Sequence, residues 1–186
     1  MTLKEKINDT IRDVEDFPKK GIVFKDITPI LDDPSLSEEI VDEFYLSLPK
    51  GVTHIAGIES RGFLFGFPAA MKNKSGFVLI RKKGKLPYKT VSVTYDLEYG
   101  TAEIEMHIDA LKTGDRVIIH DDLLATGGTA VAAAKLIQSQ GAEILGFSFV
   151  VELAFLEGRK RLEEFTSNIT SCLLYTSPSP RDLDLS

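Results

Sequence analysis

The stretch VIIHDDLLATGGTAVAAAKLIQSQG, residues 117–141, predicts both the fold and the position of a ligand site. It begins with a short apolar run, which is typical of a strand buried on both faces of a parallel sheet. Asp121 and Asp122 follow, and a turn with two adjacent glycines then leads into an alanine-rich helix. In an open parallel sheet, ligands bind beyond the carboxyl ends of the strands, and a helix N-terminus offers free N–H groups to an anion. The stretch therefore predicts a ligand that carries an anion together with a diol or a metal-bound group.

Composition limits the classes of protein to which the chain can belong. With 186 residues, of which 43% are hydrophobic, the chain is long enough for one domain with a sizeable core. Its net charge of −6 argues against non-specific binding of nucleic acid. No apolar run reaches the roughly 20 residues of a membrane span, and the N-terminus lacks the apolar region of a secretory signal. We therefore expect a cytoplasmic protein that binds neither nucleic acid nor membrane.

Few residues are available for disulfides or for a metal site built from protein ligands alone. Cys172 is the single cysteine, which excludes an internal disulfide. His54, His107 and His120 are scattered along the chain without the paired spacing of metal ligands.

Hydrophobic periodicity predicts an α/β fold with a mainly parallel sheet flanked by helices. Thr2 and Glu5 form a capping box, and apolar residues at helical spacing extend the first helix as far as Val14. Asp33 and Pro34 begin a second helix. Strict alternation over 91–95 and 101–108 predicts a two-stranded antiparallel arm with one covered face. The remaining strands are expected at 53–58, 76–82, 116–120 and 143–153, and the remaining helices at 61–71 and 129–140.

The end of the chain differs from the rest in composition. From Cys172 on, the sequence CLLYTSPSPRDLDLS contains turn formers and has no sustained period. We interpret residues 172–186 as a translated cloning segment outside the fold, the alternative being a natural disordered tail. This predicts a single domain over residues 1–171 and assigns no role to Cys172.

The run DDLLATGGT resembles the phosphoribosyl-diphosphate signature of type I phosphoribosyltransferases, and within them the adenine-specific branch. It is neither a Walker loop nor a dinucleotide fingerprint, because no Gly-Lys-Ser/Thr follows and its glycines are adjacent. The resemblance implies that Asp121 and Asp122 face the ribose hydroxyls, directly or through Mg²⁺. It also implies that a loop holds the ribose 5′-phosphate, formed by Ala125, Thr126, Gly127, Gly128 and Thr129.

Two further stretches match the pyrophosphate end of that family's site. IESRGF, residues 58–63, resembles the loop that wraps the pyrophosphate, and IRKKGKLPY, residues 80–88, is the dense basic cluster of an otherwise acidic chain. Growing negative charge on a leaving pyrophosphate would be stabilised by such cations. The residues implied are Glu59, Ser60, Arg61, Lys82, Lys83 and Lys85; which lysine makes the contact stays open.

The resemblance also implies a base-binding hood at about residues 1–34 and a lid arm at about residues 82–108. In the hood stretch DFPKKGIVFKDITPIL, main-chain groups of Val23 and Lys25 would read the adenine edge while Phe24 packs on the base. Glu98 at the tip of the arm would reach the nucleobase and assist proton handling, and Tyr99 would move with the lid.

Together these features imply a purine salvage enzyme that converts adenine and phosphoribosyl diphosphate into AMP and pyrophosphate with Mg²⁺, as a homodimer. Two alternatives remain open: transfer to another purine base, and a non-catalytic regulator that senses phosphoribosyl diphosphate. One departure lies inside the signature, where His120 stands in place of the usual aliphatic residue. We expect it to be a core histidine satisfied by a neighbouring strand.

Overall fold

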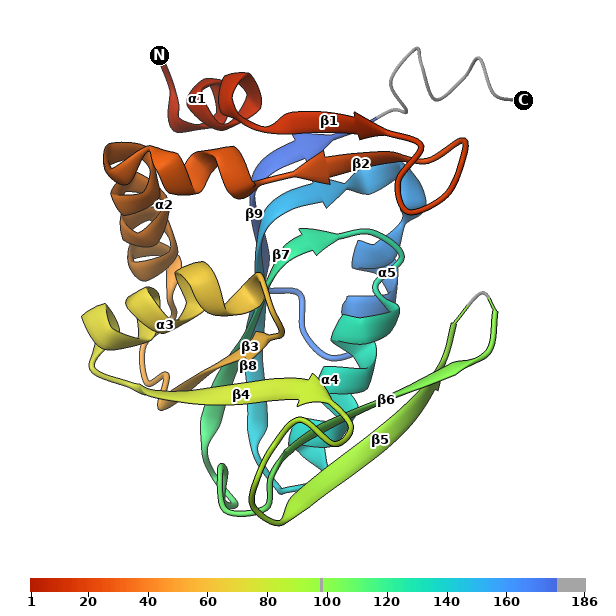
Figure 1. Ribbon diagram of the computed structural model, residues 1–186. Helices are drawn as coiled ribbons and strands as arrows, with labels where there is room; N and C mark the ends of the chain where they lie inside the picture. Colours follow the sequence, from red (N-terminus) through yellow and green to blue (C-terminus); the bar gives the residue numbers. More distant parts are fainter. Residues whose placement is uncertain (98, 177–186) are drawn as a thin grey trace.

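The computed structural model describes residues 1–97 and 99–176, which form a seven-stranded sheet with helices on both faces (Figure 1). The strand order is β5-β6-β4-β3-β7-β8-β9. The five strands from β4 to β9 are mutually parallel, whereas β6 and β5 add antiparallel to the β4 edge. The predicted mainly parallel α/β fold is confirmed. The strands are β3 (His54–Ile58), β4 (Gly76–Lys82), β5 (Thr90–Asp96), β6 (Thr101–His107), β7 (Arg116–Leu124), β8 (Glu143–Leu153) and β9 (Ile169–Tyr175).

Two hydrophobic cores lie on opposite faces of the sheet. One core contains α1, α2 and α3, and the other contains α4 and α5. Successive side chains of a strand point to opposite faces, so Ile118 of β7 joins the first core while Val117 and Ile119 join the second. The helices are α1 (Leu3–Thr10), α2 (Pro34–Ser47), α3 (Gly62–Asn73), α4 (Gly128–Gln138) and α5 (Gly158–Leu162), with 3₁₀ turns η1 (Thr28–Asp32) and η2 (Ala154–Leu156). Within the described ranges, no helix is both long and apolar enough to span a bilayer.

A two-stranded hood, β1 (Arg12–Glu15) and β2 (Val23–Asp26), crosses the top of the sheet in Figure 1. The prediction that the first helix continues to Val14 is wrong, because α1 ends at Thr10 and Val14 pairs with Phe24 in the hood. Pairing with β2, the next strand in the chain, satisfies these backbone groups and overrides the local helical spacing. The predicted capping box at Thr2 is present, as is the cap of α2 by Asp33.

The antiparallel arm is confirmed, and β5 and β6 pair along their whole length. Its covered face consists of Val91, Val93 and Tyr95, which pack against the core that contains α4. The tip of the arm lies on the same side of the molecule as the hood loop (Figure 1). Glu98 lies outside the described residues.

The prediction that the fold excludes the chain from Cys172 on is wrong for residues 172–175. These residues belong to β9, which pairs in parallel with β8, and Leu173 is buried in the first core. The Tyr175 hydroxyl also donates to Asn8 Oδ1 of α1 at 2.8 Å. Pairing with β8 and burial of one face stabilise residues 172–175 as a strand, although their sequence has no long hydrophobic period. Residues 177–186 of the predicted tail lie outside the described residues.

Candidate active site

The site lies where the order of the parallel strands reverses, so that successive strands are added on opposite sides. From β3 the chain crosses over α3 to β4 on one side, and from the adjacent β7 it crosses over α4 to β8 on the other. Ligands of open α/β sheets bind at such a switch point, beyond the carboxyl ends of the strands. Two adjoining cavities of about 470 and 460 Å³ open there, and Tyr95, Asp121 and Thr129 line both of them.

Strand lengths expose the two carboxylates to these cavities. The pairing of β3 with β7 ends at His120, whereas β8 continues to pair with β7 as far as Leu124. Asp121 and Asp122 are therefore part of a strand that has lost its neighbour on one side. The loop after β3 approaches closely, since a Cβ at Gly62 would lie 2.9 Å from the His120 carbonyl oxygen. Only glycine allows this contact between the loop and the diacid.

Arg61 and the two aspartates form the electrostatic centre of the site. Arg61 Nε donates to Asp122 Oδ2 at 2.6 Å, and Asp122 is 3% exposed. Burial and the neighbouring charge of Asp122 raise the pKa of Asp121 well above its usual value. Two adjacent buried carboxyl groups repel each other when both are ionised, so the site favours a ligand that brings a cation or hydroxyl donors.

The first cavity is basic. It is lined by Arg61, Arg81, Lys82 and Lys85 together with Glu59 and Ser60. These side chains come from the loop after β3 and from the end of β4, which lie side by side because the two strands pair in parallel. The structure thus brings together the two stretches that the sequence predicted to bind pyrophosphate.

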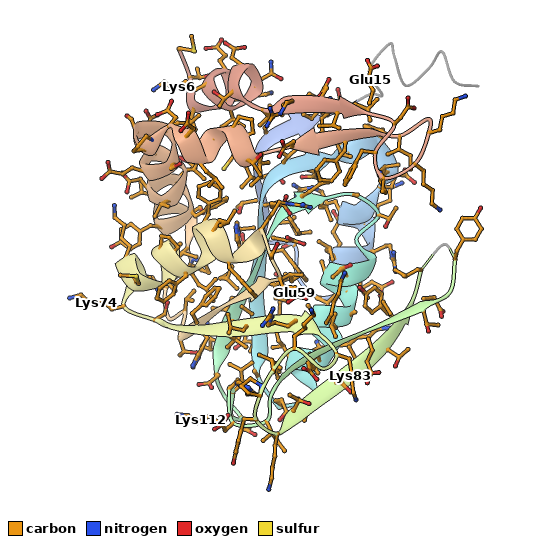
Figure 2. The ribbon with its side chains drawn as sticks, viewed as in Figure 1. Lys6, Glu15, Glu59, Lys74, Lys83 and Lys112 are labelled. Atoms are coloured by element: carbon orange, nitrogen blue, oxygen red, sulfur yellow. The ribbon has the colours of Figure 1, made fainter. Side chains whose placement is uncertain are left out.

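Within this cavity Glu59 positions cations. Its carboxylate accepts Arg81 Nε at 2.5 Å and the Lys82 main-chain N–H at 3.2 Å (Figure 2 labels Glu59). Burial alone would raise the pKa of Glu59, but the hydrogen bonds from Arg81 and Lys82 outweigh it and the pKa lies below its usual value. As an anion, Glu59 orients Arg81 and the start of the basic loop.

Sequence reasoning missed Arg81 and included Lys83, which the structure does not bring to the cavity. Lys83 Nζ pairs with Glu103 Oε1 at 3.0 Å, and Figure 2 shows Lys83 by the arm, away from Glu59. Arg81 is part of the same basic cluster, but the cluster alone does not tell which cations turn inward. A side chain's direction depends on the strand pleat and on the turn at Gly84, where φ is +87°.

The second cavity lies at the N-terminus of α4. All five predicted loop residues from Ala125 to Thr129 line it. Gly127, with φ +85°, precedes α4 as its N-cap, and the first N–H groups of a helix have no partner within it and favour an anion. Arg161 of α5, which the sequence did not predict, also lines it and donates from Nη1 to the Thr126 carbonyl oxygen at 3.1 Å.

The hood contacts the site through Phe24, although its residues are not among those that line the two cavities. The Phe24 ring lies 5.0 Å from the guanidinium carbon of Arg61, which joins the predicted base site to the diacid. The Lys25 side chain turns away to Asp13 Oδ1 at 2.7 Å, so only main-chain groups of Lys25 remain for a ligand. Lys19 Nζ lies 4.6 Å from the centre of the Tyr99 ring, so the hood loop contacts the arm.

His120 is buried beneath the diacid. Its Nδ1 lies 2.9 Å from Ser148 Oγ on the neighbouring strand, as expected, and its ring packs edge-on against Phe44. Its Nε2, however, has no hydrogen-bond partner within the described part of the chain. Burial lowers the pKa of His120 to about 4, so the ring is neutral at pH 7.

Comparison with known proteins agrees with this geometry. Residues 30–174 match the family model of the phosphoribosyl transferase domain. An adenine phosphoribosyltransferase from Anaeromyxobacter dehalogenans is 56% identical over 154 residues, which are 82% of this chain and 89% of that protein. The chain belongs to the adenine phosphoribosyltransferase family. The predicted family resemblance is therefore confirmed.

Solved structures of family members share the whole fold. The adenine phosphoribosyltransferase of Thermoanaerobacter pseudethanolicus superposes with a TM-score of 0.88 at 48% identity, covering 94% of this chain and all of that one. The enzyme of Saccharomyces cerevisiae, complexed with an imino-altritol bisphosphate and adenine, gives a TM-score of 0.86 at 38% identity, covering 92% and 98%.

Proposed function

We propose that this protein transfers the 5-phosphoribosyl group from phosphoribosyl diphosphate to adenine, giving AMP and pyrophosphate in purine salvage. The observation that carries the proposal is the pair of adjoining cavities, one basic and one at the N-terminus of α4, with Asp121 on the wall that they share and Asp122 on the basic one. A ribose with a phosphate at one end and a diphosphate at the other has the matching distribution of charge. Solved relatives that bind adenine support the choice of base.

In this proposal each cavity binds one end of the substrate. The 5′-phosphate accepts N–H groups of the loop from Ala125 to Thr129 at the start of α4, where the helix dipole favours an anion. The diphosphate lies among Arg61, Arg81, Lys82 and Lys85. The ribose hydroxyls lie between the two ends, against Asp121 and Asp122.

The residues present fit a Mg²⁺ ion that is bound mainly through the substrate. Mg²⁺ prefers oxygen ligands and in phosphate sites takes one or two carboxylates together with phosphate oxygens and water. Asp121 and Asp122 supply such carboxylates, while the described residues contain no cluster of three or more potential protein ligands. When bound, Mg²⁺ would neutralise charge on the diphosphate and improve it as a leaving group.

In the reaction, a bond forms on one face of the ribose carbon C1 while the bond on its opposite face breaks. Adenine N9 attacks as the bond to the diphosphate oxygen breaks, and positive charge develops on the ribose. The negative charge of Asp121 and Asp122 stabilises that cation, and the guanidinium groups of Arg61 and Arg81 stabilise the departing pyrophosphate. Much of the acceleration comes from holding the two substrates in line.

Adenine would enter beneath the hood. Its ring packs on Phe24, and main-chain groups of Val23 and Lys25 recognise its edge. Glu98, which lies outside the described residues, is the proposed group for handling the proton that adenine loses. Contact between Lys19 and Tyr99 holds the hood loop against the arm and helps to exclude water from the reacting ribose.

A homodimer is part of the proposal, and α3 offers a surface for it. Leu64, Phe67 and Met71 are 38%, 51% and 63% exposed and follow one another at helical spacing, so they share one face of the helix. Such an apolar stripe is typical of an interface. The predicted cytoplasmic location stays a prediction.

The test is to incubate the purified protein with Mg²⁺, phosphoribosyl diphosphate and, separately, adenine, hypoxanthine, guanine or xanthine, and to quantify nucleotide by chromatography. AMP from adenine alone is the expected result. A different nucleotide would keep the phosphoribosyl site and overturn the assignment of the base. Binding of phosphoribosyl diphosphate without any product would instead identify a sensor.

A further inference from the structure

Glu105 of β6 is a buried carboxylate that the mechanism above does not use. It is 2% exposed although it lies in the arm, which is otherwise well exposed on its outer face. Its Oε1 accepts the main-chain N–H of Gly84 at 3.1 Å and that of Leu86 at 3.0 Å. A carboxylate is costly to bury, and here hydrogen bonds to a distant loop offset that cost.

The loop that Glu105 binds is the basic loop, residues 83–86. After Lys82 the chain leaves the sheet, turns at Gly84 with φ +87°, and directs two alternate N–H groups to one carboxylate oxygen. Between those two N–H groups lies Lys85, which lines the basic cavity. Arg81 Nη1 also donates to the Lys85 carbonyl oxygen at 3.4 Å, so Lys85 is held from both sides of its backbone.

Electrostatics agree with this role. Burial alone would raise the pKa of Glu105, but the N–H groups of Leu86 and Gly84 outweigh it, and the pKa lies below its usual value. A carboxylate that accepts several backbone N–H groups is stabilised as the anion. Glu105 is therefore charged at neutral pH, and a hydrogen bond from the Thr90 side chain also favours the anion.

We propose that Glu105 is a positioning residue, which fixes the basic loop in the conformation that presents Lys85 to the diphosphate end of the substrate. The inference rests on the proposed function, because it assigns the basic cavity to the diphosphate. Without Glu105 the loop would have to become ordered each time a diphosphate binds. The entropic cost of this ordering would lower the affinity for the diphosphate end of the substrate. The base site beneath the hood would be unaffected.

The neighbouring Glu103 provides a matched control. It lies two residues away on the same strand and on the same face, and it is also a carboxylate near the basic loop. Glu103 instead accepts the Lys83 ammonium at 3.0 Å and the Ser92 hydroxyl at 2.6 Å, away from the cavity. Its side chain is about one third exposed, at 34%.

The experiment compares the variants E105A, E105D and E105Q with E103A. Asp keeps the charge but shortens the side chain by one methylene group, so it cannot reach both N–H groups, whereas Gln keeps an acceptor oxygen at the same reach. For each variant we would measure KM for phosphoribosyl diphosphate and for adenine, and the Kd of magnesium pyrophosphate by calorimetry. Thermal unfolding checks that each variant is folded.

We expect E105A and E105D to raise both KM for phosphoribosyl diphosphate and Kd for pyrophosphate about tenfold. The entropic cost of ordering the backbone of one residue corresponds to a change in affinity of that size. In E105Q and in E103A, KM for phosphoribosyl diphosphate and Kd for pyrophosphate should both stay near the wild-type values. KM for adenine should be unchanged in every variant. If E105A fails to fold, the contrast between E105D and E105Q decides.

Two results would overturn the inference: an unchanged Kd for pyrophosphate in E105D, or equal losses at the adenine and diphosphate ends. Calorimetry separates this inference from the proposed function, because pyrophosphate binding needs no turnover. A protein that makes no AMP but binds pyrophosphate more weakly in E105D and not in E105Q would refute the transfer reaction and leave the role of Glu105 intact.

Discussion

Replacing His120 with isoleucine and Ser148 with alanine should stabilise the protein, by an amount that grows as the pH falls. In the folded chain His120 Nε2 is buried and unpaired within the described residues, which costs about 1–3 kcal/mol. The adjacent residues of β7, Ile118 and Ile119, show that this strand accommodates isoleucine. Ser148 is changed as well, because removing the ring alone would leave its hydroxyl without the partner at 2.9 Å.

The pH dependence follows from the lowered pKa of His120. Burial lowers this pKa to about 4, from an ordinary value of 6.5 in the unfolded chain. Between those values the unfolded chain takes up a proton that the folded chain refuses, so the wild type loses stability as the pH falls from 6.5 to 4. The loss is about 2 kcal/mol between pH 7.5 and pH 5 and about 3 kcal/mol at its limit. The double variant lacks this loss.

The assay is urea unfolding of the wild type, the double variant and Ser148→Ala alone, at pH 7.5 and pH 5. The difference in unfolding free energy between double variant and wild type should increase by about 2 kcal/mol at pH 5, or about 4–8 °C in Tm. Ser148→Ala should show the same pH dependence as the wild type, since it keeps the histidine. A difference that does not change with pH would refute the reasoning.

Three further perturbations test other parts of the structure. Gly127→Ala should lower Tm and weaken binding of phosphoribosyl diphosphate, measured by calorimetry, because φ is +85° and the new Cβ would lie 3.0 Å from the Gly158 carbonyl oxygen. Arg159→Ala should cost about 3 kcal/mol in urea unfolding at pH 7, because it leaves the buried Glu152 with the Ser171 hydroxyl but without its cationic partner. The cost should shrink as the pH falls, because Arg159 lowers the pKa of Glu152 and this stabilisation is lost once the carboxyl is protonated. Asp121→Asn should raise Tm at pH 7, because burial and a neighbouring charge raise the pKa of Asp121 and its ionised form opposes folding. AMP formation should fall about 100-fold or more. A stable variant that keeps full turnover would contradict the assigned role.

Long periodic patterns in the sequence were sufficient to predict the sheet, its flanking helices and the arm. Residues 91–95 alternate strictly, and Val91, Val93 and Tyr95 indeed form the covered face. Short segments were not predictable in this way. Residues 12–15 have helical spacing but pair with β2, and residues 172–175 lack a long period but complete the sheet as β9. In both cases pairing with a neighbouring strand, which the hydrophobic period does not reveal, decides the structure.

Some features of the candidate site are likewise set by the local sequence, and others by the tertiary structure. The acids and the glycine loop are contiguous, so their place beyond a strand and before a helix is a local property that the sequence by itself determined. Which cations of the basic cluster line the cavity was decided by the tertiary structure, because Arg81 is bound by Glu59 and the backbone on both sides of Lys85 is bound by Glu105. These carboxylates come from the loop after β3 and from β6, and contacts of that kind depend on strand pairing and loop geometry, which no local pattern encodes.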